Sequence, residues 1–194
     1  GGDRGSYSMS VGYTTHEGTV KSSYFDRYSL RANTTFIPSQ YFTIGQNTNL
    51  TAMTYGGDRG EQGDASVFAQ TYTIQPWVPV YNVGGDFAGS QAAEGGRATS
   101  AVNTVENTKN DWTKTFRGQA AVFAELKPIE GLNIKSQFSA RLNGQWILTF
   151  NERTIMSNKE GASINLLEEQ ADWRFNWQWT NTATYTRKFN EVHD

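Results

Sequence analysis

The strongest constraint in this sequence is an alternation of polar and apolar residues with a period of two, sustained over long runs. Successive side chains of a β-strand point to opposite faces, so each run predicts a strand with one wet face. In residues 116–126 one face carries Phe116, Gly118, Ala120, Val122, Ala124 and Leu126, and the other carries Arg117, Gln119, Ala121, Phe123 and Glu125. Residues 6–13, 20–36, 41–52, 132–150 and 173–187 repeat the pattern, which predicts about six strands in all.

The composition favours strands that face water on one side and lipid on the other. Hydrophobic residues make up only 37% of the chain, yet aromatic residues reach 13%. Disordered chains are usually poor in aromatic residues, whereas a membrane β-barrel is both polar and aromatic. The formal net charge of -2 argues against a nucleic-acid partner. The chain has no cysteine, which excludes disulfides and thiol chemistry.

Neither a transmembrane helix nor a signal peptide is expected from the sequence. No run of about 18 apolar residues occurs, and the first residues, Gly1 to Arg4, do not begin an apolar segment. If the protein is exported, we expect this chain to be mature or internal.

The predicted connections between strands are of two very different lengths. Residues 14–18, 38–40 and 127–131 read as short turns. Residues 53–111 and 151–172 read as long loops, and residues 164–170 within the second could form a helical turn. Bacterial outer-membrane barrels have short periplasmic turns and long extracellular loops. We therefore predict an all-β, antiparallel, up-and-down transmembrane barrel segment in which 53–111 and 151–172 are extracellular.

A soluble or surface-exposed β-sandwich that binds glycans is the main alternative, because it also has strands with one wet face. Three features disfavour it. The predicted strands exceed the usual soluble length of about 3–10 residues. A loop as long as 53–111 is unusual in a compact domain. The apolar faces also contain much Ala, Gly, Ser and Thr, which is lean for a shared core. An enzyme ranks third.

Several stretches of the sequence resemble the SusC/RagA family, the TonB-dependent outer-membrane transporters of Bacteroidota. The residues that carry the resemblance are Tyr7–Tyr13 with Glu17–Gly18, Ser23–Asn33 (S-x-F-x-R-x-S-x-R-x-N), Pro79–Asn82 with Gly85–Gly89, Gly131–Ser136 (G-L-x-x-K-S), and Trp179–Tyr185 with His193. Each piece is weak alone, but their order and spacing together are fairly specific. The resemblance spans nearly the whole chain.

This resemblance implies a larger protein with a plug domain and a barrel of about 22 strands. The chain would supply about six of these strands as an internal fragment, without the plug and the TonB-binding segment. It further implies import of glycans or peptides across the outer membrane. The implied partners are a SusD-like surface lipoprotein, TonB through parts absent here, and outer-membrane lipid. No enzymatic activity and no cofactor are expected.

Two sets of residues are candidates for substrate contact. Trp77, Tyr81 and Phe87 provide flat apolar surfaces in the first long loop, and Asn82 and Asp86 provide hydrogen bonds, a pairing that suits sugar rings or peptides. Packing of Trp77 and Tyr81 against neighbouring loops explains them equally well. The second set shares the polar faces of the strands and could line the lumen: Arg27, Arg31, Arg117, Lys135 and Arg141. These cations could equally pair with acidic plug or barrel residues.

No metal site is predicted. Asp58, Glu61 and Asp64 could offer oxygen ligands to Ca²⁺, but they lack the full spacing of a calcium loop, which favours a solvated loop. Gly56–Gly60 follows a strand without opening a helix, which disfavours a phosphate-binding loop. The histidines His16 and His193 lie far apart in the sequence, so a histidine-based site is disfavoured.

Overall fold

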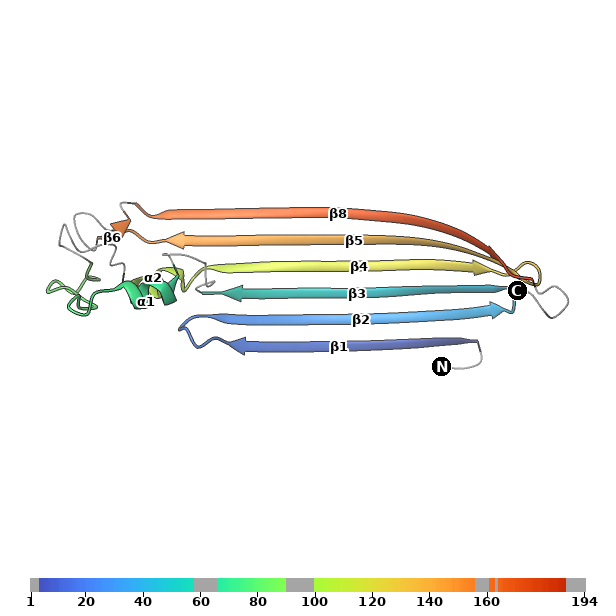
Figure 1. Cartoon of the computed structure of the whole chain (residues 1–194), viewed down its shortest axis with the longest axis horizontal. Helices are drawn as coiled ribbons and strands as arrows, with labels where there is room; N and C mark the ends of the chain where they lie inside the picture. Colours follow the sequence, from blue (N-terminus) through green and yellow to red (C-terminus); the bar gives the residue numbers. More distant parts are fainter. Residues whose placement is uncertain (1–3, 58–65, 90–99, 156–160, 163, 188–194) are drawn as a thin grey trace.

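The chain forms one long antiparallel sheet with helices at one end (Figure 1). The computed structural model describes residues 4–57, 66–89, 100–155, 161–162 and 164–187. The sheet has six strands in the order β1-β2-β3-β4-β5-β8. They are β1 (Gly5–Glu17), β2 (Tyr24–Ser39), β3 (Phe42–Gly56), β4 (Trp112–Leu126), β5 (Leu132–Asn151) and β8 (Leu166–Tyr185). The predicted all-β, antiparallel, up-and-down architecture is confirmed.

Neighbouring strands of this sheet pair along nearly their whole length, and β8 follows β5 because β6 and β7 form a separate sheet. The pair of β5 and β8 extends from Leu132 opposite Tyr185 to Asn151 opposite Leu166. Both of these strands have 20 residues, well beyond the usual soluble length of about 3–10. β1 and β8 are the two edges, so within the described residues the sheet is open.

Residues that are directly opposite in an antiparallel pair share a face of the sheet, so the registers define two faces. The apolar face carries the row Met9, Ala32, Thr48, Ala120, Ala140 and Trp177. The polar face carries the adjacent row Ser10, Arg31, Asn49, Gln119, Arg141 and Asn176. The predicted assignment of side chains to the two faces of each strand is therefore confirmed.

The apolar face is open to its surroundings along the whole sheet. Four aromatic side chains of β8, Trp173, Phe175, Trp177 and Trp179, are each 63–65% exposed. Among the described residues, the buried apolar side chains are Val67 and Ala88, both in the connection between β3 and β4. The described part of the chain thus has no apolar core under the sheet.

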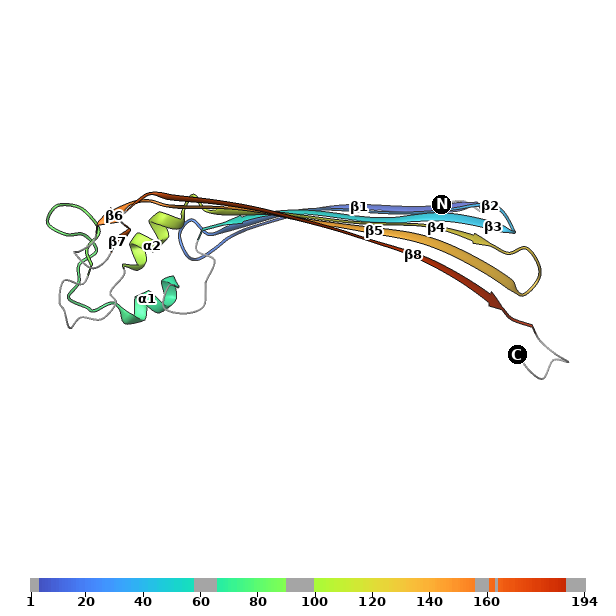
Figure 2. The same ribbon diagram turned by 90° about the horizontal axis from the view of Figure 1, so that it is seen from above.

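The β3–β4 connection contains two short helices, α1 (Val67–Thr73) and α2 (Ala101–Thr108). Each begins at a serine whose side-chain oxygen accepts a backbone hydrogen bond, Ser66 from Ala69 and Ser100 from Asn103. The Thr104 hydroxyl of α2 donates to Gln70 Oε1 of α1 at 2.7 Å. Figure 2 shows both helices on one side of the sheet, the side toward which β8 curves at its far end.

Several predicted boundaries are wrong. Residues 14–17 continue β1, and the first turn is 18–23, where Ser22 has a φ of 69°. Pro38 and Ser39 belong to β2, whose register with β3 shifts between Phe36 and Ser39. Residues 166–170 continue β8 instead of forming a helical turn. Residues 53–56, predicted to open the first long loop, continue β3. The two long connections therefore span 57–111 and 152–165 instead of 53–111 and 151–172.

The second long connection includes a small two-stranded sheet of β6 (Thr154–Ile155) and β7 (Gly161–Ala162). Both long connections leave the same end of the sheet, together with the 18–23 turn. The opposite end carries the short turns at 40–41 and 127–131. Over the described ranges, no helix has the length and apolarity needed to cross a membrane.

Candidate functional site

The five predicted lumen-lining cations lie on one face of the sheet. The register places Arg27, Arg31, Arg117, Lys135 and Arg141 on the polar face, together with Arg174 of β8. Cross-strand pairing, and not sequence proximity, brings them together. Arg117 lies opposite Asn143, which in turn lies opposite Arg174.

A groove of about 800 Å³ runs across this polar face. Arg27, Arg117, Arg141 and Arg174 line it, with Asn49, Gln119, Asn143 and Gln145 between them. Its lining residues include one carboxylate, that of Asp172. Guanidinium groups bind carboxylates and phosphates through paired hydrogen bonds. The groove is therefore suited to a polar substrate that carries negative charge.

Arg31 and Lys135 do not line this groove. Arg31 occupies the same cross-strand row as Arg141, closer to the β1 edge. Lys135 lies nearer the short-turn end, where its ammonium group is 4.7 Å from the centroid of the Phe123 ring. A contact of this kind holds the ammonium over the ring, so Lys135 has a defined position on the polar face.

A second pocket lies among the long connections, beyond the end of the sheet that carries them. It has a volume of about 530 Å³. Its lining comes from both long connections and includes Tyr81, Asp86, Phe87, Glu106, Asn107, Lys109, Glu152, Arg153 and Thr154. The Tyr81 and Phe87 rings stack with centroids 5.3 Å apart. The pocket thus combines an aromatic pair with side chains of both charges.

Asn82 and Asp86 build the turn that carries this aromatic pair. The side-chain oxygen of Asn82 accepts a 3.0 Å hydrogen bond from the backbone N–H of Asp86. The backbone N–H of Asn82 donates to the Asp86 carbonyl at 2.8 Å, and Tyr81 bridges to Phe87. Gly85 completes the turn with a φ of 90°. The side-chain oxygen of Asn82 is therefore used within the turn, whereas the Asp86 side chain lines the pocket.

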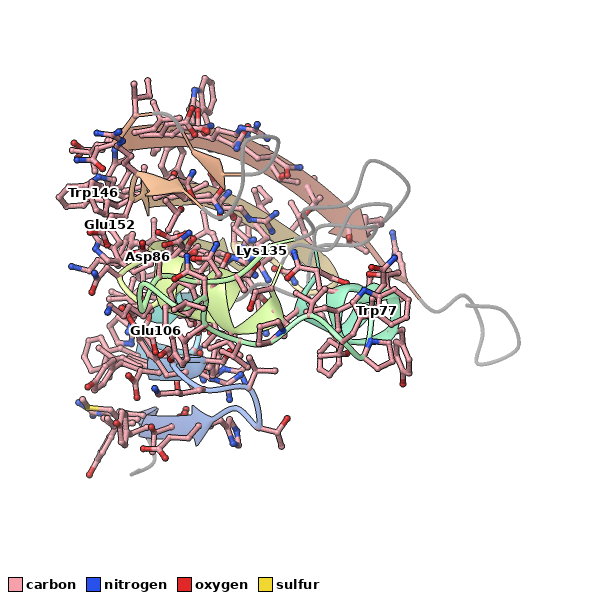
Figure 3. The ribbon with its side chains drawn as sticks, turned by 90° about the vertical axis from the view of Figure 1, so that its left-hand side faces the viewer. Trp77, Asp86, Glu106, Lys135, Trp146 and Glu152 are labelled. Carbon is pink, nitrogen blue, oxygen red and sulfur yellow. The ribbon has the colours of Figure 1, made fainter. Side chains whose placement is uncertain are left out.

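Trp77 does not join the other four predicted loop residues. Figure 3 shows Asp86, Glu106 and Glu152 gathered on one side of the connections and Trp77 on the other. Trp77 is 75% exposed and is not among the residues that line the pocket. The structure thus brings together Tyr81, Asn82, Asp86 and Phe87 and leaves Trp77 apart.

Helix α2 is tied to the β1–β2 turn by a charged contact beside the pocket. Lys21 and Lys109 donate to the two carboxylate oxygens of Glu106 at 3.0 and 3.1 Å. The hydrogen bond from Lys21, followed by that from Lys109, lowers the pKa of the Glu106 carboxyl below its ordinary value of 4.5. Both contacts favour the ionised carboxylate, so Glu106 contributes a negative charge to the lining of the pocket.

Two known proteins are similar to this chain in sequence. A TonB-dependent receptor of Formosa agariphila is 25% identical over 193 residues, covering 100% of this chain and 18% of the relative. A second TonB-dependent receptor of the same organism is 26% identical over 198 residues, covering 97% of this chain and 18% of the relative. No family model matches the chain.

Solved structures with a similar fold include the RagAB peptide importer. The RagAB peptide importer in its closed-closed state matches with a TM-score of 0.74 and 21% identity, over 98% of this chain and 21% of that one. The open-open state matches with a TM-score of 0.70 and 22% identity, over 95% and 20%. The chain is similar in sequence to these two TonB-dependent receptors, and its fold matches that of the RagAB structures. It spans about a fifth of the length of these relatives.

The structure adds several site residues that the sequence did not indicate. Arg174 and Asp172 join the groove because β8 pairs with β5, although Arg174 already alternated with the tryptophans in the sequence. Glu152 and Arg153 join the loop pocket from the second long connection. No local sequence signal points to Glu152 or Arg153, because only the fold brings the two connections together.

The structure offers no candidate metal centre among the described residues, where no three His, Cys, Asp or Glu side chains gather. The predicted alternative of a Ca²⁺ loop at Asp58, Glu61 and Asp64 lies outside the described residues, as does His193. His16 lies in β1, where its ring stacks on that of Phe25 with centroids 6.2 Å apart. His16 therefore packs against an aromatic ring.

Proposed function

We propose that this chain forms part of the barrel wall of an outer-membrane TonB-dependent transporter, with its polar face toward the lumen and its apolar face toward lipid. The observation that carries this proposal is the distribution of charge on the apolar face. Among the described residues, the charged side chains on this face are Glu17, Asp26, Lys114 and Glu169, all near the end that carries the long connections.

The charge-free part of this face has the height of a membrane. Along β5 it extends from Leu132 to Gly144, which is about 40 Å at about 3.4 Å per residue. Barrel strands are tilted by about 35–45°, which reduces the height to about 30 Å. The hydrocarbon core of a bilayer is also about 30 Å thick. An apolar face of this extent is therefore stable in lipid and costly in water.

Polar side chains inside this band satisfy one another within the face. Gln46 donates to Thr34 at 3.4 Å and accepts from Thr48 at 2.6 Å. The Trp179 indole donates to the Ser136 hydroxyl at 2.9 Å. Unsatisfied polar groups are costly in hydrocarbon, so these lateral hydrogen bonds support an orientation toward lipid.

The cationic groove supports transport of a substrate that carries carboxylates. Arg27, Arg117, Arg141 and Arg174 would face the lumen and guide the substrate by charge. Peptides and acidic glycans both carry such groups. The solved relatives are described as a peptide importer and transporter, which makes a peptide the first substrate to test and a glycan the second.

In this proposal the long connections lie on the extracellular side of the membrane. Short turns face the periplasm and long loops face the exterior in bacterial barrels, so residues 57–111 and 152–165 would be extracellular. We infer that the loop pocket between them meets the substrate first, beside a SusD-like surface lipoprotein. Import would be driven through TonB, which acts on parts of the protein outside this chain.

A glycan-binding β-sandwich is disfavoured as the alternative. A sandwich buries its apolar face under a second sheet, yet Trp173, Phe175 and Trp177 are exposed on this face. Within the described residues, the second sheet consists only of β6 and β7, with two residues each. This small sheet lies among the connections and does not cover the strands (Figure 2).

Uptake by intact cells tests the proposal. Cells that produce the complete protein carrying this chain should accumulate labelled peptides or acidic oligosaccharides, and an uncoupler of the proton gradient should abolish the accumulation. The protein should remain in the membrane fraction after alkaline washing. Recovery in the soluble fraction without detergent, or uptake that is insensitive to the uncoupler, would overturn it.

A further inference from the structure

A single ammonium group marks the outer border of the charge-free band. Among the described residues, Lys114 is the only cation on the apolar face. Its ammonium group lies 4.4 Å from the centroid of the Trp112 ring and 5.7 Å from that of Trp146. The two rings meet edge to face with centroids 5.0 Å apart. The Lys114 ammonium group is therefore held against two tryptophan rings that pack on each other.

The nearby carboxylates on this face are engaged elsewhere. The Tyr13 hydroxyl donates to Asp26 at 3.0 Å, and the Trp146 indole donates to Glu169 at 2.6 Å. No ion pair within 4.0 Å joins Lys114 to a carboxylate of the described residues. The positive charge of Lys114 thus remains available to a ligand that approaches from outside the sheet.

The position of Lys114 defines what that ligand can be. The next residue on the same face, Phe116, begins the charge-free band, so Lys114 lies at the depth where lipid headgroups meet hydrocarbon. Tryptophan side chains prefer this depth, and a lysine there extends its ammonium group toward the polar side. In Figure 3, Trp146 projects from the side of the sheet away from α1, where neighbouring lipid would lie.

We propose that Lys114, Trp112 and Trp146 form a binding site for the phosphate headgroup of an outer-leaflet lipid. The phosphate would accept hydrogen bonds from the ammonium group, and the two rings would contact the sugar or glycerol part and the first carbons of the acyl chains. This inference rests on the proposed function, because it requires the apolar face to meet lipid. It adds a specific lipid contact to a face that otherwise contacts hydrocarbon without selectivity.

Native mass spectrometry of the complete, detergent-solubilised protein tests the site. The probes are bis-phosphorylated lipid A and its dephosphorylated form, added in equal amounts, with inorganic phosphate as a separate competitor. The variants are K114Q, the conservative K114R, and K135Q as a matched control on the opposite face. A charge-assisted hydrogen bond contributes about tenfold in affinity.

We expect the unaltered protein to retain the phosphorylated lipid about tenfold better than the dephosphorylated one. K114Q should abolish this preference, whereas K114R and K135Q should retain it. Millimolar inorganic phosphate should not displace the lipid. An unchanged preference in K114Q, an equal loss in K135Q, or displacement by free phosphate would overturn the lipid site.

Flotation of the same variants with vesicles separates this inference from the proposed function. If the unaltered protein fails to float with phosphatidylcholine vesicles, the membrane assignment itself is wrong, and the lipid site falls with it. If all variants float equally but K114Q keeps the lipid A preference, only the lipid site is wrong. Equal flotation together with a lost preference in K114Q supports both.

Discussion

The carboxylate of Asp111 accepts a 2.8 Å hydrogen bond from the backbone N–H of Phe150. Asp111 is buried, and its own carbonyl accepts from the N–H of Gly57 at 3.2 Å. Asp111 therefore joins the two ends of the β3–β4 connection and attaches them to the C-terminal end of β5. This contact fixes where both long connections leave the sheet.

Replacing Asp111 by alanine should destabilise this end of the sheet by about 1–3 kcal/mol, because the half-buried N–H of Phe150 loses its acceptor. Asparagine retains an acceptor oxygen, so D111N should lose less. Denaturant unfolding of the complete protein in detergent measures both. The exposed Asp86 supplies the control D86A, and a loss in D86A as large as in D111A would contradict the role given to the buried contact.

The charged contact of Glu106 should make the docking of α2 depend on pH. Lys21 and then Lys109 lower the pKa of Glu106 in the folded protein. A lowered pKa adds stability that is fully present above the unfolded value of 4.5 and is lost as the pH falls through the folded pKa. Amide exchange in α2, corrected for intrinsic rates, should therefore accelerate below this pH. The E106Q variant should show a flatter profile, and identical profiles would contradict this assignment.

Two glycines with similar positive φ angles should respond differently to replacement by alanine. Gly131 has a φ of 82° and Gly85 a φ of 90°. An added Cβ at Gly131 would collide with the backbone oxygen of Thr186, whereas at Gly85 it would meet nothing within 4 Å. G85A should cost about 1 kcal/mol from backbone strain alone, and G131A about 2–4 kcal/mol. Denaturant midpoints compare them, and equal losses would argue against the packed turn.

The loop pocket predicts different effects for two aromatic residues. Tyr81 stacks on Phe87 in the pocket lining, whereas Trp77 lies apart. Y81A should weaken substrate binding about 5–10-fold, as expected for an aromatic contact residue. W77A should leave the affinity unchanged. Equilibrium binding of the transported peptide or oligosaccharide measures both, and a larger loss in W77A would place the binding surface elsewhere.

Much of the sheet could be predicted because its information is local. Alternation along residues 116–126 and 132–150 specifies both the strand and its two faces, and the observed registers agree. The start of β8, residues 166–172, was not predicted because Leu166–Gln170 contains good helix formers. Pairing with β5 along 20 residues outweighs this weak local preference. Strand propensity reflects the partner strand, which the local sequence does not contain.

The candidate sites were only partly accessible from the sequence. The polar-face arginines could be predicted to share a surface because the period of two already separates the faces. Their grouping into one groove depends on registers between strands distant in sequence. The loop pocket depends on contacts between two connections, such as the 3.5 Å hydrogen bond from Asn107 to Thr154. The serine caps Ser66 and Ser100 were the available signals for α1 and α2.

The most direct test of the membrane orientation compares two adjacent alanines of β4. Ala120 lies on the apolar face near the middle of the charge-free band, and Ala121 lies on the polar face. An arginine on the lipid face at the bilayer midplane costs about 2–4 kcal/mol. The denaturant-unfolding free energy of the complete protein in phospholipid bilayers should therefore fall by this amount in A120R and by less than about 1 kcal/mol in A121R. Equal losses in the two variants, or a larger loss in A121R, would contradict the assignment of the apolar face to lipid.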